Sequence, residues 1–220
     1  MNRLDILKKT ISSDKPNFTK VNLYHQGNVG YISLRSPKDL NCLSTTMLSE
    51  ISLALKEMQK DEQVNVIVFI SELSHIFCAG ADIKEFAKPD FDYENGVRFE
   101  PLHLIEEAFQ KNRKPVIAAV NGKALGGGFE LALLCDIILA SEKSFFAFPE
   151  INLGVFPGLG GTQRFSKIVG EKKAMRHILT GEGFNAEEAY RLNVAEKISS
   201  ENFNQQVLSY LYRFNFSQRK

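Results

Sequence analysis

The apolar and polar positions along the chain alternate between strand-like and helix-like spacing. Two short apolar stretches, Val21–Leu23 and Gly30–Leu34, flank the turn residues Gln26–Asn28 and predict a hairpin. Val64–Ile70 and Val116–Val120 are apolar at odd and even positions alike, which is typical of strands buried on both faces. These longest apolar runs have the length of strands and are far too short to span a bilayer.

Other segments place their apolar residues every three or four positions. One helix is predicted to start at Ser44 or Thr45, either of which can cap it. The other predicted elements are a helix through Leu104–Phe109 that ends before Pro115, helices over Gly127–Leu134, Thr162–Val169 (capped by Thr162), Lys172–Leu179, Ala186–Leu192 and Phe203–Phe214, and strands over Asp136–Ala140 and Phe145–Phe148. The predicted loops are Phe77–Glu85, Pro89–Gly96 and Ile151–Gly161. This alternation predicts an α/β fold.

Length and net charge bear on the number of domains and on the kinds of partner that the protein could bind. A chain of 220 residues is expected to form one domain with a sizeable core. The 27 basic and 26 acidic residues leave a net charge of +1, which gives no electrostatic footprint for binding nucleic acid, RNA included.

Three cysteines, Cys42, Cys78 and Cys135, form no Cys-x-x-Cys pair, which favours reduced thiols in an intracellular compartment. The four histidines have no ligand spacing to one another or to the cysteines, so no metal site is expected. The first residues, Met1–Asn17, combine basic, hydroxyl and apolar side chains as a short targeting presequence would. Asp5 and Asp14 within them favour a frayed N-terminal arm instead.

Two glutamates stand in apolar surroundings within Asn121–Glu150. Glu130 follows three consecutive glycines and lies in the first turn of an otherwise apolar predicted helix. Glu150 follows the aromatic run Phe145–Phe148 and a proline. Burial raises the pKa of a carboxyl group toward the range where it exchanges protons. Either glutamate alone could be a solvated or capping residue, but together, beside glycine turns, they favour acid/base chemistry.

Two glycine-containing loops could supply backbone N–H donors. Gly126–Gly128 and Gly158–Gly161 fit neither the dinucleotide-binding fingerprint nor the P-loop. A glycine turn before a helix leaves N–H groups free to hold a developing oxyanion, although tight helix packing would explain it equally well. Ala79–Asp82 also follows a predicted strand and could place a second donor at the same oxygen, or be a plain turn.

Several motifs, in order, resemble those of the enoyl-CoA hydratase/isomerase (crotonase) family. The resemblance covers roughly Phe18 to Lys197, and the segments that carry it are Phe77–Glu85, Asn121–Ala132, Phe148–Gly154, Pro157–Arg164 and Leu179–Glu182. It implies an α/β spiral of repeated β-β-α units, with residues 1–17 as an N-terminal extension, 18–197 as the crotonase-like core and 198–220 as a shortened C-terminal helical segment. Most of the helical trimerisation region is then expected to be missing.

The resemblance also implies roles for individual residues. Glu130 and Glu150 would be the catalytic pair, the N–H groups of Ala81 and Gly127 would form the oxyanion hole, and Gly158 would help to hold a water molecule. The residues implied to bind coenzyme A are Lys38, Leu40, Ala79, Ala81, Asp82, Ile83, Lys84 and Gly127. Asp39 departs from the family pattern, because a small apolar residue is common beside this lysine.

The activity implied is syn addition of water to a trans-2-enoyl-CoA, giving a 3-hydroxyacyl-CoA in fatty-acid or branched-chain amino-acid breakdown. Coenzyme A would enter as part of the substrate, with no separate cofactor and no metal. A homotrimer or hexamer is expected, with no nucleic-acid or membrane partner, in the mitochondrial matrix of a eukaryote or otherwise in the cytoplasm. An enoyl-CoA isomerase and a non-catalytic crotonase-like assembly subunit remain as alternatives, since the tail Phe203–Lys220 matches no family segment.

Overall fold

The computed structural model describes residues 17–86 and 100–213. Nearly all of the N-terminal arm and the predicted Pro89–Gly96 connection lie outside this part of the chain.

The larger of two sheets has the strand order β1-β2-β3-β5-β7-β10. The predicted hairpin forms its edge, with β1 (Val21–Gln26) antiparallel to β2 (Val29–Leu34). The remaining neighbours pair in parallel, through β3 (Val66–Ser71), β5 (Val116–Val120), β7 (Ile137–Ser141) and β10 (Glu196–Ile198). Parallel pairing requires crossover connections, and helices supply them.

A second, smaller sheet carries the predicted chemistry. Its order is β4 (Ile76–Cys78), β6 (Lys123–Leu125), β8 (Phe145–Ala147) and β9 (Phe184–Asn185). Each of β4, β6 and β8 follows a strand of the large sheet and precedes a helical segment, which is the repeated β-β-α unit that the resemblance implies. Because these three strands are parallel, their carboxyl ends meet at one edge.

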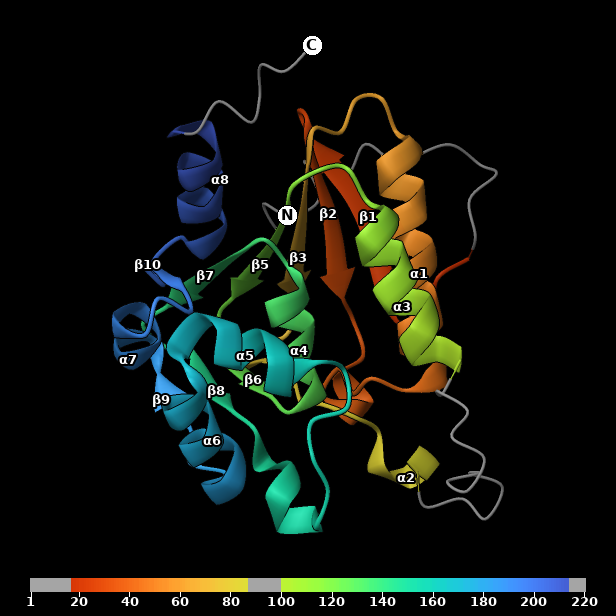
Figure 1. Ribbon diagram of the computed structural model, residues 1–220. Coiled ribbons are helices and arrows are strands. Elements are labelled where there is room, and N and C mark those ends of the chain that lie inside the picture. Colours follow the sequence, from red (N-terminus) through yellow and green to blue (C-terminus); the bar gives the residue numbers. More distant parts are fainter. Residues whose placement is uncertain (1–16, 87–99, 214–220) are drawn as a thin grey trace.

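Helices cover the two faces of the large sheet unequally. The long helices α1 (Thr45–Lys60) and α3 (Glu100–Lys111) lie side by side on one face (Figure 1). α4 (Gly127–Leu134) lies in the same apolar core. The opposite face packs against α8 (Phe203–Arg213) through its buried apolar residues. The remaining helical segments are η1 (Pro37–Asp39), α2 (Ile83–Phe86), η2 (Pro149–Leu153), α5 (Gly161–Val169), α6 (Glu171–Thr180) and α7 (Ala186–Arg191).

Most predicted elements are confirmed, and the differences are a helix cap and several short strands and turns. Ser44 caps α1, accepting a hydrogen bond from the Met47 N–H at 3.2 Å. Thr162 was the wrong cap for α5, because Gly160 takes that position and Thr162 lies inside the helix. The predicted loops Phe77–Glu85 and Ile151–Gly161 are each partly structured, by β4 and α2 in the first and by η2 in the second.

Five phenylalanine rings, contributed by α4, the small sheet, α5 and the residue before η2, pack together. Phe129 lies at their centre, with ring centroids 4.7 Å from Phe148 and 5.1 Å from Phe146. Phe165 and Phe184 complete the cluster. These rings exclude water from the side of α4 that carries Phe129, next to Glu130.

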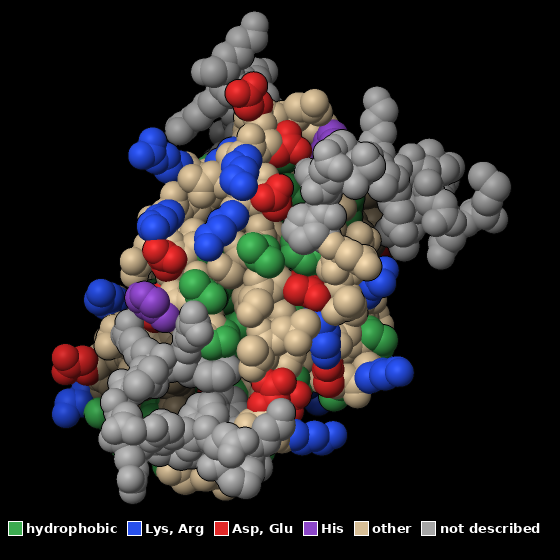
Figure 2. All heavy atoms as spheres, turned by 90° about the vertical axis from the view of Figure 1, so that its right-hand side faces the viewer, with side chains coloured by type: hydrophobic (Ala, Val, Ile, Leu, Met, Phe, Trp, Pro, Cys, Tyr) green, Lys and Arg blue, Asp and Glu red, His purple; other side chains and the backbone are tan. Residues whose placement is uncertain are grey.

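One face of the molecule carries charges of both signs. On the face that carries α1 and α3, basic and acidic side chains are interspersed with one another (Figure 2). No helix among the described residues is long and apolar enough to cross a membrane.

Candidate active site

Glu130 is a buried carboxylate held by the backbone of a neighbouring loop. Its side chain projects from the first turn of α4, and the residue is 2% exposed. Its Oε1 accepts hydrogen bonds from the N–H groups of Leu159 and Gly161, both at 2.7 Å. Burial, the largest effect, and the nearby charge of Glu150 together raise the pKa of Glu130 to about 7, against the lowering effect of these backbone donors.

Glu150 faces the same region from η2. Burial raises the pKa of its carboxyl above the ordinary value. Its Oε2 is buried and has no hydrogen-bond partner in the described structure. A buried carboxylate oxygen without a donor is unfavourable unless it is protonated or meets a ligand. Glu150 therefore retains one unused hydrogen-bonding position.

The Gly126–Gly128 turn brings the two carboxyl groups together. Gly126 has a φ of +51°, and a Cβ there would lie 2.5 Å from Glu150 Oε1. Only glycine meets both requirements without strain. Gly128 lies against β4, where a Cβ would lie 2.7 Å from Cys78 Cβ. Gly126 thus lets the start of α4 approach η2, and Gly128 lets α4 approach β4, more closely than a side chain would allow.

The two N–H groups predicted for the oxyanion hole lie close together. Ala81 N lies 3.5 Å from the position that a Cβ on Gly127 would take. Gly127 is the first residue of α4, where an N–H has no acceptor within the helix. The loop before Ala81 is fixed to Leu43, whose N–H donates to Gly80 O at 2.7 Å.

The predicted coenzyme A residues fall on two adjacent loops, except Gly127, which begins α4. Lys38 lies in η1 and Leu40 directly follows it, and both residues are exposed. Ala81, Ile83 and Lys84, around the start of α2, are exposed as well. Ala79 N donates to Leu40 O at 3.1 Å, which joins the two loops. Asp82 is half-buried and accepts from the Lys84 N–H. These loops are therefore neighbours, and coenzyme A binding by their residues stays a prediction.

Asp39, the departure from the family pattern, is neutralised within the protein. It pairs with Lys20, which also donates to Ser36. Burial would raise the pKa of the Asp39 carboxyl, but the hydrogen bonds from Lys20 and Ser36 lower it overall. The negative charge beside Lys38 is thereby matched by a cation.

Gly158 also faces Glu130, because its N–H is one of the backbone groups that lower the pKa of Glu130. The N–H groups of Leu159 and Gly161 were not predicted as partners of Glu130. A glycine loop running into a helix N-terminus was the available signal, since such loops leave N–H donors free. The sequence could not show which carboxylate they would meet.

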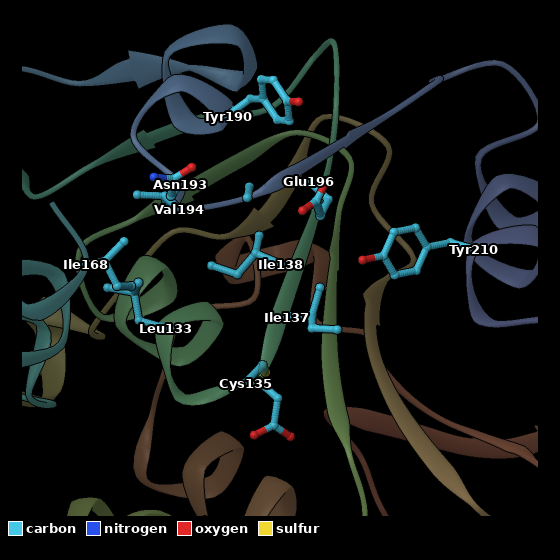
Figure 3. A pocket seen from close by; sticks show the side chains of 12 residues that line it. Leu133, Cys135, Ile137, Ile138, Ile168, Tyr190, Asn193, Val194, Glu196 and Tyr210 are labelled. Atoms are coloured by element: carbon cyan, nitrogen blue, oxygen red, sulfur yellow. The ribbon is translucent and has the colours of Figure 1, made fainter. Parts of the chain in front are cut away.

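A cavity of about 390 Å³ lies away from this site, at the other end of α4 (Figure 3). Side chains from α4, β7, α5, α7 and α8 surround it, and no predicted site residue lines it. In the described part of the chain, His, Cys, Asp and Glu residues form no group that could hold a metal ion.

The chain is similar to known enoyl-CoA hydratases. Residues 24–216 match the family model described as enoyl-CoA hydratase/isomerase. A probable mitochondrial enoyl-CoA hydratase from Dictyostelium discoideum is 47% identical over 176 residues, which cover 79% of this chain and 61% of that protein. A probable enoyl-CoA hydratase from Rhizobium meliloti is 45% identical over 173 residues, covering 79% of this chain and 66% of that one.

The fold is shared with solved structures. Subunit I of an enoyl-CoA hydratase from Geobacillus kaustophilus superposes with a TM-score of 0.82 at 40% identity, over 92% of this chain and 77% of that chain. An enoyl-CoA hydratase from Bacillus anthracis gives a TM-score of 0.79 at 31% identity, over 89% of this chain and 76% of that one.

Proposed function

The chain belongs to the enoyl-CoA hydratase/isomerase family, and from this premise we propose that it adds water to trans-2-enoyl-CoA thioesters. The observation that carries the proposal is the pair formed by buried Glu130 and half-buried Glu150. The pKa of each carboxyl group is raised, and the charge of Glu150 contributes to the rise at Glu130. Many acid/base reactions need one such group, but adding both parts of water to a double bond uses two.

The N–H groups of Ala81 and Gly127 would bind the thioester oxygen. Addition of hydroxide at the β-carbon builds enolate charge on that oxygen, and preorganised donors act where the charge develops. Removing one such donor typically slows a reaction by about 100-fold or more.

The two glutamates would divide the water between them. Glu130, as a carboxylate, would take a proton from water while the oxygen attacks the β-carbon. Glu150, protonated, would give its proton to the α-carbon on the same face, and Gly158 N–H would help to hold the water. Mutual repulsion favours one proton on the pair, which is the state that this division requires. The product is a 3-hydroxyacyl-CoA, and a proton returned from Glu130 to Glu150 restores the starting state.

The test is the loss of absorbance of crotonyl-CoA with purified protein. We expect hydration, and a fall of roughly 100-fold or more in kcat for Glu130→Gln and for Glu150→Gln. Glu142→Gln is the matched control, because Glu142 accepts from the Ser200 N–H, outside the site. A folded protein without turnover above background would contradict the proposal.

The same variants separate hydration from isomerisation. An isomerase that shuttles its proton through Glu150 would keep much of its rate after Glu130→Gln, whereas a hydratase would not. A non-catalytic assembly subunit would show no turnover with either substrate type. The presence of both carboxyl groups in one site, with Glu130 buried and Glu150 half-buried, favours the hydratase.

The proposal extends to the partners of the reaction. Coenzyme A enters as part of the substrate, and no separate cofactor or metal is required by these steps. The pathway would be fatty-acid or branched-chain amino-acid breakdown, and a mitochondrial location is proposed by analogy with the Dictyostelium relative. We also propose self-association into a trimer or hexamer, supported by an exposed apolar surface on η2, the following loop and α6, made of Leu153, Val155, Phe156, Met175 and Leu179.

A further inference from the structure

Arg164 lies behind the loop that holds Glu130, and none of the steps above uses it. It lies one turn into α5 and is partly buried, with a side chain 30% exposed. Its Nη1 donates to Leu159 O at 2.6 Å. Its Nη2 lies 4.0 Å from Glu106 Oε1 of α3. The guanidinium therefore bridges the loop and a helix that packs elsewhere on the molecule.

Both backbone groups of Leu159 form hydrogen bonds with side chains. Its N–H donates to Glu130 Oε1 at 2.7 Å, while its carbonyl accepts from Arg164. The next residue, Gly160, has no side chain, and a Cβ there would collide with Arg164 Nη1. Gly161, the other donor to Glu130, follows directly. The guanidinium thus contacts the short segment between the two donors.

We propose that Arg164 is a positioning residue that aims the Leu159 and Gly161 N–H groups at Glu130, an inference that rests on the proposed hydration. A charge-assisted hydrogen bond from a guanidinium is among the stronger contacts available to a loop carbonyl. It fixes a segment whose glycines would otherwise be free to rotate. Without it, the donors to Glu130 are less well aligned.

The effect reaches Glu130 through the loop. The groups that set the pKa of Glu130 are its own burial, the N–H groups of Gly161, Leu159 and Gly158, and the charge of Glu150 from η2. Arg164 of α5 and its neighbour Glu106 of α3 lie beyond that loop. Loss of the hydrogen bond from Arg164 to Leu159 O lets the loop move and lengthens the hydrogen bonds to the Glu130 carboxylate. Longer hydrogen bonds destabilise the charged form of Glu130 and raise its pKa.

Two readouts follow for Arg164→Gln. The kcat for crotonyl-CoA should fall on the order of 10- to 100-fold with little change in KM, because the coenzyme A surface lies on other loops. The titration midpoint of Glu130 should move upward by about one unit, the size expected when one charge-assisted hydrogen bond is largely lost. Arg164→Lys, which can still donate to Leu159 O, should recover part of both effects.

The midpoint is measured by carbon-13 NMR of the glutamate carboxyl groups in the ligand-free protein, with Glu130→Gln to assign the signal. Arg176→Gln is the matched control, since Arg176 forms an exposed ion pair with Glu182 on α6 and its following turn. Its kcat and the Glu130 midpoint should equal those of the unmodified protein.

The outcomes separate this inference from the proposed function. An upward shift in Arg164→Gln, partly reversed in Arg164→Lys, supports the positioning role even if no hydration is observed, in which case only the proposed function fails. An unchanged Glu130 midpoint in a folded Arg164→Gln protein overturns the inference, whatever the activity. Should Arg164→Gln not fold, Arg164→Met, which keeps the apolar stem but has no donor for Leu159 O, takes its place, and an unshifted Glu130 midpoint in that variant overturns the inference.

Discussion

Burial of the Glu130 carboxyl group is unfavourable for the stability of the folded protein when the group is ionised. It is almost fully buried, it lies near a second carboxyl group, and its pKa is raised to about 7. Two backbone donors offset only part of this cost. Residues of this kind concentrate at functional sites, where a pKa near neutrality is useful for proton transfer.

This cost gives a pH-dependent prediction for stability. The pKa of Glu130 rises from the ordinary 4.5 to about 7 in the folded state, so its contribution is favourable below pH 4.5 and is lost as the pH rises to 7. The loss is on the order of 3 kcal/mol, from 2.5 units at about 1.4 kcal/mol each. The Glu130→Gln variant cannot ionise at this position, so it should not show this loss of stability.

The measurement is the free energy of unfolding of both proteins by urea denaturation at pH 4.5 and pH 8. The difference between the variant and the unmodified protein should move in favour of Glu130→Gln at the higher pH. An equal pH dependence in the two proteins would contradict the raised pKa. Glu142→Gln serves as the surface control.

At the scale of elements, the site depends on α4 packing directly against β4. Gly128 makes this approach possible, since a Cβ there would collide with Cys78 O and lie 2.7 Å from Cys78 Cβ. The contact also sets the distance between the two oxyanion donors, because β4 leads into Ala81 and α4 begins at Gly127. Stability and the geometry of the site are therefore coupled through one glycine.

Gly128→Ala should destabilise the protein by about 1–3 kcal/mol, the usual cost of overpacking a filled core. It should also lower kcat, because α4 must move away from β4. Gly158→Ala is the steric control for stability, since a Cβ there meets nothing within 4 Å. Urea denaturation compares the two, and equal midpoints would show that α4 and β4 are not in tight contact.

At the scale of the whole molecule, the two faces of the large sheet pack against different parts of the chain. One face builds the core that supports the small sheet and the carboxyl pair, while the other is covered by α8. The exposed apolar surface defined above lies on neither face, but on η2, its following loop and α6. Apolar patches of this kind frequently mark protein–protein contacts.

Self-association predicts a sedimentation mass that is a multiple of the 24.8 kDa chain. Met175→Glu, which places a charge on this surface, should shift the distribution toward single chains. Tyr212→Glu on α8 is the matched control, because Tyr212 and Met175 are similarly exposed, at 52% and 55%. A single-chain mass for the unmodified protein at micromolar concentration would contradict the assembly.

The sequence by itself determined the α/β class, most strands and helices, and the two glutamates as candidates. These features follow from local rules: apolar periodicity, glycine turns, and the cost of a carboxylate among apolar neighbours. The motifs of Asn121–Ala132 and Phe148–Gly154 added the family. The short strands β9 and β10 were not predicted, because two or three residues carry too little periodicity.

Only the tertiary structure decided which groups meet. Leu159 and Gly161 are 29 and 31 positions from Glu130, and no local pattern links them. Their contact arises because parallel strands of the small sheet end at one edge and α5 packs against α4. Hydrogen bonds act over about 3 Å, so their partners depend on how distant segments pack. For the same reason, the position of Arg164 behind Glu130 could be found only in the folded chain.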